Sequence, residues 1–72
     1  MAVFTFQTFC EQFPVDSRLA IHHQGDHGPI EKAEIYTVLE LRDNKAYLVS
    51  DRGNHYCLSF GMYGVELEAE PL

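Results

Sequence analysis

The sequence has no tryptophan, only two cysteines and few cations. Each of these shortages argues against certain classes of protein. Five Lys and Arg residues stand against eleven Asp and Glu residues, which gives a formal net charge of −6. The cations are scattered singly along the chain, so the sequence shows no basic patch that would hold phosphates. We therefore expect no direct binding to nucleic acid. The acidic balance favours solubility, or docking to a basic surface.

The two cysteines, Cys10 and Cys57, are fewer than the four or more that small secreted domains usually carry. The first residues show no basic segment followed by an apolar one, so no signal peptide is expected. No apolar run approaches the roughly 20 residues that cross a bilayer. These features predict a cytoplasmic protein with no membrane partner and with both thiols reduced. A Cys10–Cys57 disulfide is the less favoured alternative.

The length of 72 residues predicts one domain, residues 1–72. A core of this size leaves roughly 3–5 kcal/mol of stability unless a disulfide, a metal or a partner subunit adds to it. The apolar fraction of 46% argues against disorder, because disordered chains are poorer in large apolar residues.

Residues 5–13 are expected to form a short helix. Phe6, Phe9 and Phe13 recur at the spacing of one helix face, and Pro14 cannot continue the helix. Because nine residues do not hold a helix alone in water, the Phe face must dock onto something. We expect it to cap an open end of a β-barrel, and a partner-binding helix is the alternative.

The rest of the chain is expected to be β-structure. Five strands are predicted over residues 18–23, 34–42, 45–50, 55–60 and 65–69. The connections carry turn residues, with a long glycine-containing loop after the first strand, tight turns after the second and third, and a single 3₁₀ turn at residues 61–64. In the last strand Glu66, Glu68 and Glu70 alternate with apolar residues, so one face should be wet.

This order of strands, loops and turns resembles the SH3-like small barrel over residues 18–69. The resemblance implies a mainly β fold, a five-stranded SH3-like small barrel with a short N-terminal α-helix and a 3₁₀ turn before the last strand. It also implies a binding groove lined by residues 22–32, 43–45 and 60–63. The chain departs from the members that bind proline-rich peptides, because it has no Trp and no Ala-Leu-Tyr-Asp-Tyr-like stretch. It is also similar in style to small uncharacterised bacteriophage and prophage proteins, which names no function.

Three histidines near the first loop have a spacing that suggests a metal ligand set. Zinc needs three or four ligands that converge, and His22, His23 and His27 lie close in sequence. Gly25 and Pro29 oppose a helix here, however, and adjacent residues of a strand point to opposite faces. We therefore predict exposed histidines, with no metal and no cofactor, and keep a metal site as the alternative. Their charge would also rise as the pH falls through about 6.5, which suggests a second alternative, a pH switch.

Catalytic residues are not expected. His55 and Cys57 would share one face of a strand, as a nucleophilic Cys–His pair requires. A chain this short has little room for a pocket of about 300 Å³ or more. We therefore interpret Cys57 as a small structural residue and the protein as a non-enzyme.

The sequence is interpreted as a small non-enzymatic protein-interaction module. Tyr63, beside glycines in the expected 3₁₀ turn, is the best candidate for an exposed anchor. The expected partner is a protein that the sequence does not identify, and a homodimer is left open. The predicted partner-binding residues are His23, Asp26, His27, Phe60, Tyr63, Glu66 and Glu68.

Two other functions stay open beside this one. In the first, Glu34, Glu40, Asp43 and Asp51 join the last-strand glutamates on one surface that imitates nucleic-acid charge. The protein would then be an acidic inhibitor that occupies a nucleic-acid site on a host enzyme, as anti-defence proteins do. In the second, it is a metal-binding module that uses the His-rich loop.

Overall fold

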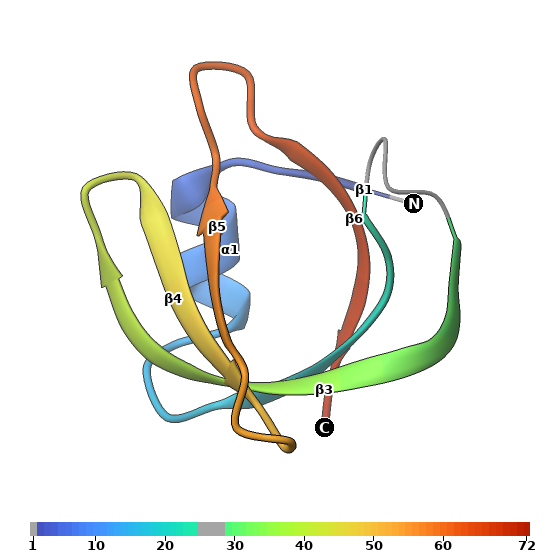
Figure 1. Ribbon diagram of the computed structural model, residues 1–72. Helices are drawn as coiled ribbons and strands as arrows, with labels where there is room; N and C mark the ends of the chain where they lie inside the picture. Colours follow the sequence, from blue (N-terminus) through green and yellow to red (C-terminus); the bar gives the residue numbers. More distant parts are fainter. Residues whose placement is uncertain (1, 25–28) are drawn as a thin grey trace.

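The computed structural model describes residues 2–24 and 29–72, and the side chains of these residues outside 23–33. Its elements are β1 (Ala2–Phe4), α1 (Phe6–Gln12), β2 (Arg18–Gln24), β3 (Pro29–Arg42), β4 (Lys45–Ser50), β5 (His55–Ser59) and β6 (Val65–Pro71). The strands form one sheet that curls into a half-barrel, and α1 lies on its concave side (Figure 1). The predicted mainly β class with one short helix is thus confirmed for the described residues.

The strand order in the sheet is β1-β6-β2-β3-β4-β5, and every pairing is antiparallel. Strand β3, with fourteen residues, runs across the bottom of the half-barrel and then turns upward to meet β4 (Figure 1). Strands β1 and β5 end the sheet on its two sides. The first strand of the chain therefore lies beside its last strand.

The prediction of five strands is wrong, because the described residues form six. The additional strand is β1, whose residues pair with β6 from Ala2 opposite Leu67 to Phe4 opposite Val65. Three residues carry too little alternation to show a strand in the sequence. Their extended form comes from the partner strand some sixty residues later.

Three strands are also longer than predicted, and β2 is longer by one residue, Gln24. Strand β3 begins at Pro29 and not at residue 34, because its ladder with β2 continues past a register shift to the pair His23–Pro29. Strand β6 continues to Pro71, which lies opposite Leu19. The predicted 3₁₀ turn at residues 61–64 is an ordinary turn over residues 61–63.

Helix α1 has the amphipathic form that the sequence predicted. Thr5 caps its first turn, since its hydroxyl accepts from the Thr8 backbone N–H at 3.2 Å while the Thr8 hydroxyl accepts from the Thr5 N–H at 2.9 Å. The chain leaves the helix at Phe13, one residue before Pro14. In the part of the chain described, no helix has the length and apolarity needed for a bilayer crossing.

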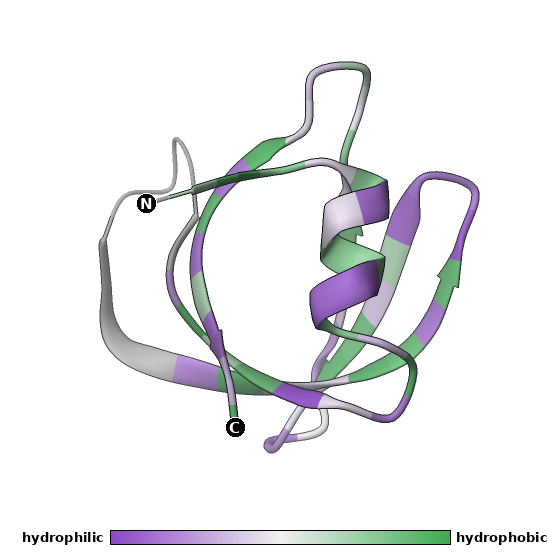
Figure 2. Cartoon of the chain, turned by 180° about the vertical axis from the view of Figure 1, so that it is seen from behind, coloured by the Kyte–Doolittle hydropathy of each residue, from purple (hydrophilic) through white to green (hydrophobic). Residues whose placement is uncertain are grey.

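The hydrophobic core joins α1 to the concave side of the sheet. Phe9 is fully buried. The centre of its ring lies 5.0 Å from the ring centre of Phe13, 5.1 Å from that of Phe60 and 6.1 Å from that of Phe4. Figure 2 shows α1 against this side of the sheet, with hydrophobic and hydrophilic residues in turn along the helix. The Phe face that the spacing predicted is therefore the lid of the core.

Candidate functional site

The most prominent exposed apolar feature among the described residues is the loop of residues 60–64, which we call the β5–β6 loop. Met62 and Tyr63 at its tip are 87% and 86% exposed. The loop projects beyond the end of the sheet, at the top of Figure 1. Large apolar side chains this exposed gain nothing for the fold, and side by side they are typical of a contact surface.

The base of the β5–β6 loop is tied to the turn between β3 and β4. The Phe60 N–H donates to the Asn44 carbonyl oxygen at 3.1 Å, and the Asn44 side-chain amide donates to the Gly61 carbonyl oxygen at 2.8 Å. The Phe60 side chain points into the core, with its ring 5.8 Å from that of Phe6. Gly61 and Gly64 both have positive φ, at 60° and 85°. The loop thus presents an exposed tip on an anchored base.

Charged side chains crowd the turn that holds this base. Arg42 contacts Glu40 and Asp43, each with an N–O distance of 2.8 Å, and its guanidinium carbon lies 4.8 Å from the centre of the Tyr47 ring. The hydrogen bond that Arg42 donates to Asp43 and the negative charge of Glu40 raise the pKa of Arg42 above its ordinary value. Because all three charges are exposed, we assign this group little weight in stability.

Strand β6 carries a row of exposed carboxylates. Glu66, Glu68 and Glu70 face solvent, while Leu67 between them is fully buried. The predicted wet face of this strand is therefore confirmed. Glu70 also contacts His22, with 3.2 Å between Oε1 and Nε2. Among the described side chains, Glu70 is thus the one carboxylate of this row with an ion-pair partner.

The structure brings together some of the predicted partner-binding residues. Tyr63 stands at the exposed tip of the β5–β6 loop, and Phe60 lies beneath it with 1% exposure, so Phe60 supports the loop and offers no surface for contact. Glu66 and Glu68 follow the loop on β6. The side chain of His23, and the residues Asp26 and His27, lie outside the described residues.

Two residues of this site, Met62 and Asn44, were not among the partner-binding residues predicted from the sequence. Met62 was passed over beside Tyr63, although both stand between the same two glycines. Asn44 was read only as a turn residue. Its backbone is left-handed, with φ of 62°, and its side-chain amide donates to the Gly61 carbonyl oxygen.

Several acidic residues outside β6 have cationic partners. Asp51 pairs with Arg18 through two contacts of 2.8 and 3.0 Å. Glu40 and Asp43 share Arg42, as described above. Of the acidic residues predicted to join the β6 glutamates, three therefore have cationic partners among the described side chains.

Metal ligation has no support among the described residues, where no three His, Cys, Asp or Glu side chains gather as a ligand set. Of the three histidines predicted as alternative ligands, the side chain of His22 is described, and its Nε2 faces the Glu70 carboxylate. His27 and the side chain of His23, which the metal alternative also needs, lie outside the described residues.

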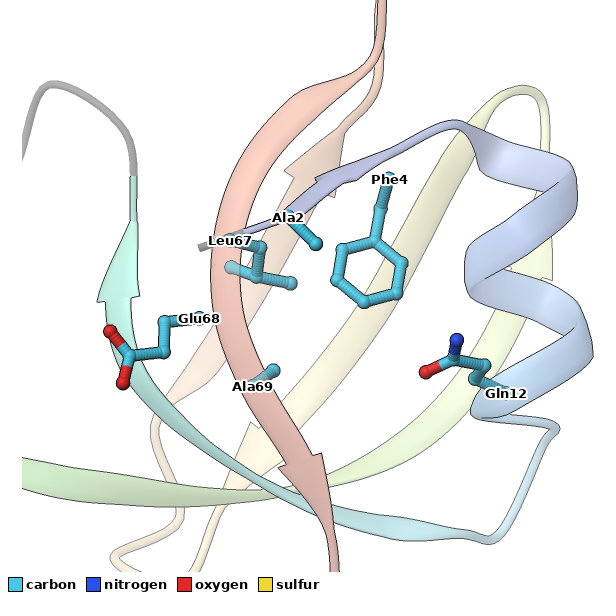
Figure 3. A pocket seen from close by; sticks show the side chains of 6 residues that line it. All are labelled: Ala2, Phe4, Gln12, Leu67, Glu68 and Ala69. Carbon is cyan, nitrogen blue, oxygen red and sulfur yellow. The ribbon is translucent and has the colours of Figure 1, made fainter.

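The two cysteines are free. Cys57 lies exposed on β5, two residues from the equally exposed His55, and its partner across the ladder is Tyr47. A hollow of about 400 Å³ occurs elsewhere, between β1, α1 and β6, and its lining residues are Ala2, Phe4, Gln12, Leu67, Glu68 and Ala69. In Figure 3 the Phe4 ring and the Gln12 amide point into it, whereas the Glu68 carboxylate lies on the other side of β6. The Cys–His pair and the hollow therefore belong to different parts of the molecule.

Comparisons of the chain with protein-family models, with curated proteins and with solved structures gave no match.

Proposed function

We propose that the chain is a non-enzymatic protein-interaction module that docks through Met62 and Tyr63 of the β5–β6 loop. The observation that carries this proposal is the near-complete exposure of two large apolar side chains on a loop with an anchored base. The partner is a protein with an apolar pocket that takes up the two side chains.

The chemistry of the tip suits such docking. Tyrosine gives a large apolar contact area with a hydroxyl for one hydrogen bond, and it is enriched among the residues that dominate binding energy. Methionine is flexible and fills irregular apolar gaps. Because Asn44 and Phe60 already fix the base of the loop, little conformational entropy remains to be lost there on binding.

The arrangement of the sheet supports a finer structural proposal, that β2–β6 form an SH3-like barrel to which β1 adds a sixth strand. In that family the turn after the second strand and the turn before the last strand line one binding groove. Here the Asn44–Gly61 hydrogen bond joins these same two turns. The likeness thus favours binding on the side of the molecule that carries the β5–β6 loop.

A second candidate function rests on the exposed carboxylates of β6. Alternate residues of a strand lie about 6.6 Å apart, so Glu66, Glu68 and Glu70 give a regular line of negative charge. Such a line supports an acidic inhibitor that occupies a nucleic-acid site on an enzyme. The contact between His22 and Glu70 weakens the line at one end.

Site-specific photocrosslinking tests the proposed docking site. A benzophenone amino acid is placed at position 63, or at position 15 as the control, where Val15 is exposed in the connection between α1 and β2 on another side of the molecule (Figure 1). Each protein is irradiated in bacterial lysate, and the crosslinked products are identified by mass spectrometry. We expect one product at position 63 that is absent at position 15 and lost when Met62→Ala is added.

Salt concentration separates the two candidate functions. Docking by an apolar tip should give the same product at low and high salt, because its contact does not depend on long-range charge. An acidic mimic should lose its partner as salt rises, and the triple change of Glu66, Glu68 and Glu70 to Gln should abolish binding. Equal products at positions 63 and 15, unaffected by Met62→Ala, would contradict docking by the loop.

A further inference from the structure

Strand β5 is an edge strand without a charged residue, a proline or a bulge. It pairs with β4 and, among the described residues, with no other strand. Its five residues, His55–Ser59, contain no Lys, Arg, Asp, Glu or Pro. Edge strands of soluble proteins commonly carry a charge, a proline or a bulge that keeps other strands away, and β5 has a regular ladder.

The hydrogen-bond pattern of the β4–β5 ladder shows which backbone groups face outward. The Ser50 N–H donates to Asn54 O at 2.9 Å and the Phe60 N–H donates to Asn44 O at 3.1 Å, at the two ends of the ladder. Bonded and non-bonded pairs alternate in an antiparallel ladder, so the even-numbered residues of β5 bond to β4. The N–H and C=O groups of the odd-numbered residues, with Cys57 central among them, therefore point to the free edge.

From this edge we infer that two copies of the chain associate by pairing β5 antiparallel with β5, with Cys57 on the two-fold axis. In this register Cys57 lies opposite Cys57 of the second copy. His55 lies opposite Ser59 at each end of the ladder. All outward backbone groups of the five-residue strand then find partners.

The absence of charged residues on β5 permits a second copy as the occupant of this edge. Like charges directly opposite each other destabilise a strand pair, and this register places none opposite another. The carboxylates of β6 lie at the other side of the sheet order, four strands away from β5. The five residues of β5 that would meet in the two copies carry none of the charges that make up the net charge of −6. The pairing uses the strand edge and not the β5–β6 loop, so it does not depend on the proposed function.

Charge substitution at the two-fold axis tests this inference. Cys57→Lys places two ammonium groups opposite each other, Cys57→Glu places two carboxylates, and Cys57→Ser serves as the neutral control. Position 57 is exposed, so all three variants should fold, which circular dichroism verifies. Molecular mass is measured under reducing conditions by sedimentation, up to about 1 mM protein, where a Kd of that size still gives clear association.

We expect a doubled mass for the wild type and for Cys57→Ser, and the monomer mass for Cys57→Lys and Cys57→Glu alone. An equimolar mixture of the Lys and Glu variants should regain the doubled mass, because opposite charges then face each other across the axis. A monomeric wild type would overturn the inference. Dimers in both charged variants would also overturn it, and so would a mixture of the Lys and Glu variants that stays monomeric. In either case β5 of one copy would not pair with β5 of the other.

Discussion

The side-chain amide of Asn44 lies 2.8 Å from the carbonyl oxygen of Gly61, and this one hydrogen bond joins two turns that are seventeen residues apart. The Asn44 carbonyl oxygen also accepts from the Phe60 N–H. One residue thus holds the base of the β5–β6 loop from both its side chain and its backbone. The position of Met62 and Tyr63 therefore depends on a residue in a different hairpin.

The first prediction concerns this hydrogen bond. Asn44→Gly keeps the left-handed backbone without strain and removes the amide, so it should lower the free energy of unfolding by about 1 kcal/mol. Asp43→Gly is the matched control, because Asp43 has the same backbone region and loses only an exposed ion pair with Arg42. Urea denaturation measures both. Equal losses in the two variants would show that the amide contributes nothing of its own.

The second prediction concerns the close approach of β6 to β1. A Cβ atom on Gly64 would lie 2.5 Å from the Phe4 carbonyl oxygen, and its φ of 85° is unfavourable for other residues. Gly64→Ala should therefore cost about 3 kcal/mol through steric overlap and backbone strain together.

The control for this change is Gly53→Ala in the β4–β5 turn. Gly53 has nearly the same φ, 86°, but open space around it, so only the conformational strain of about 1 kcal/mol should appear. The difference between the two midpoints of urea unfolding then measures the contact with β1. If both variants lose the same stability, β1 does not press against Gly64 in solution.

Local patterns predicted the elements whose structure is decided nearby. The spacing of Phe6, Phe9 and Phe13 identified the helix, and the alternation in β6 identified its wet and buried faces. Tight turns were predicted from their residue types, such as Gly53, whose φ is 86°. In each case the signal and the structure lie within about ten residues of each other.

The remaining features depend on pairing at long range, and no local pattern shows them. Strand β1 is extended because Val65–Leu67 lie beside it, and β3 starts at Pro29 because β2 continues that far. For the candidate site, the exposure of Tyr63 followed from its glycine neighbours. The burial of Phe60 did not, since it depends on the position of α1.

The third prediction concerns the aromatic core. Phe9 is fully buried among three other Phe rings, so Phe9→Ala should cost about 3–5 kcal/mol. A chain of this length has roughly 3–5 kcal/mol in total, and the variant should be largely unfolded at 25 °C. Val15→Ala, an exposed apolar change, should stay within about 0.5 kcal/mol of the wild type. Circular dichroism with urea titration measures both, and a folded Phe9→Ala would mean that α1 contributes little to the core.

The last prediction concerns the reactivity of Cys10. Partial burial raises the pKa of the Cys10 thiol, and the charge of Glu11 adds a smaller increase against an opposing backbone hydrogen bond. The thiolate is the reactive form, so a raised pKa means a smaller thiolate fraction at any pH below it. The rate of alkylation of Cys10 should therefore reach half its maximum at a higher pH in the folded protein than in the unfolded one.

The Cys57→Ser variant, in which Cys10 is the remaining thiol, allows this measurement with iodoacetamide. The pH profile of the rate is recorded in buffer and again in concentrated urea, where burial is lost. Comparing the pH of half-maximal rate, and not the rate itself, separates the pKa from simple access of the reagent. Profiles that coincide in the two solvents would contradict the partial burial of this thiol in the folded protein, because desolvation by the fold is the main cause of its raised pKa.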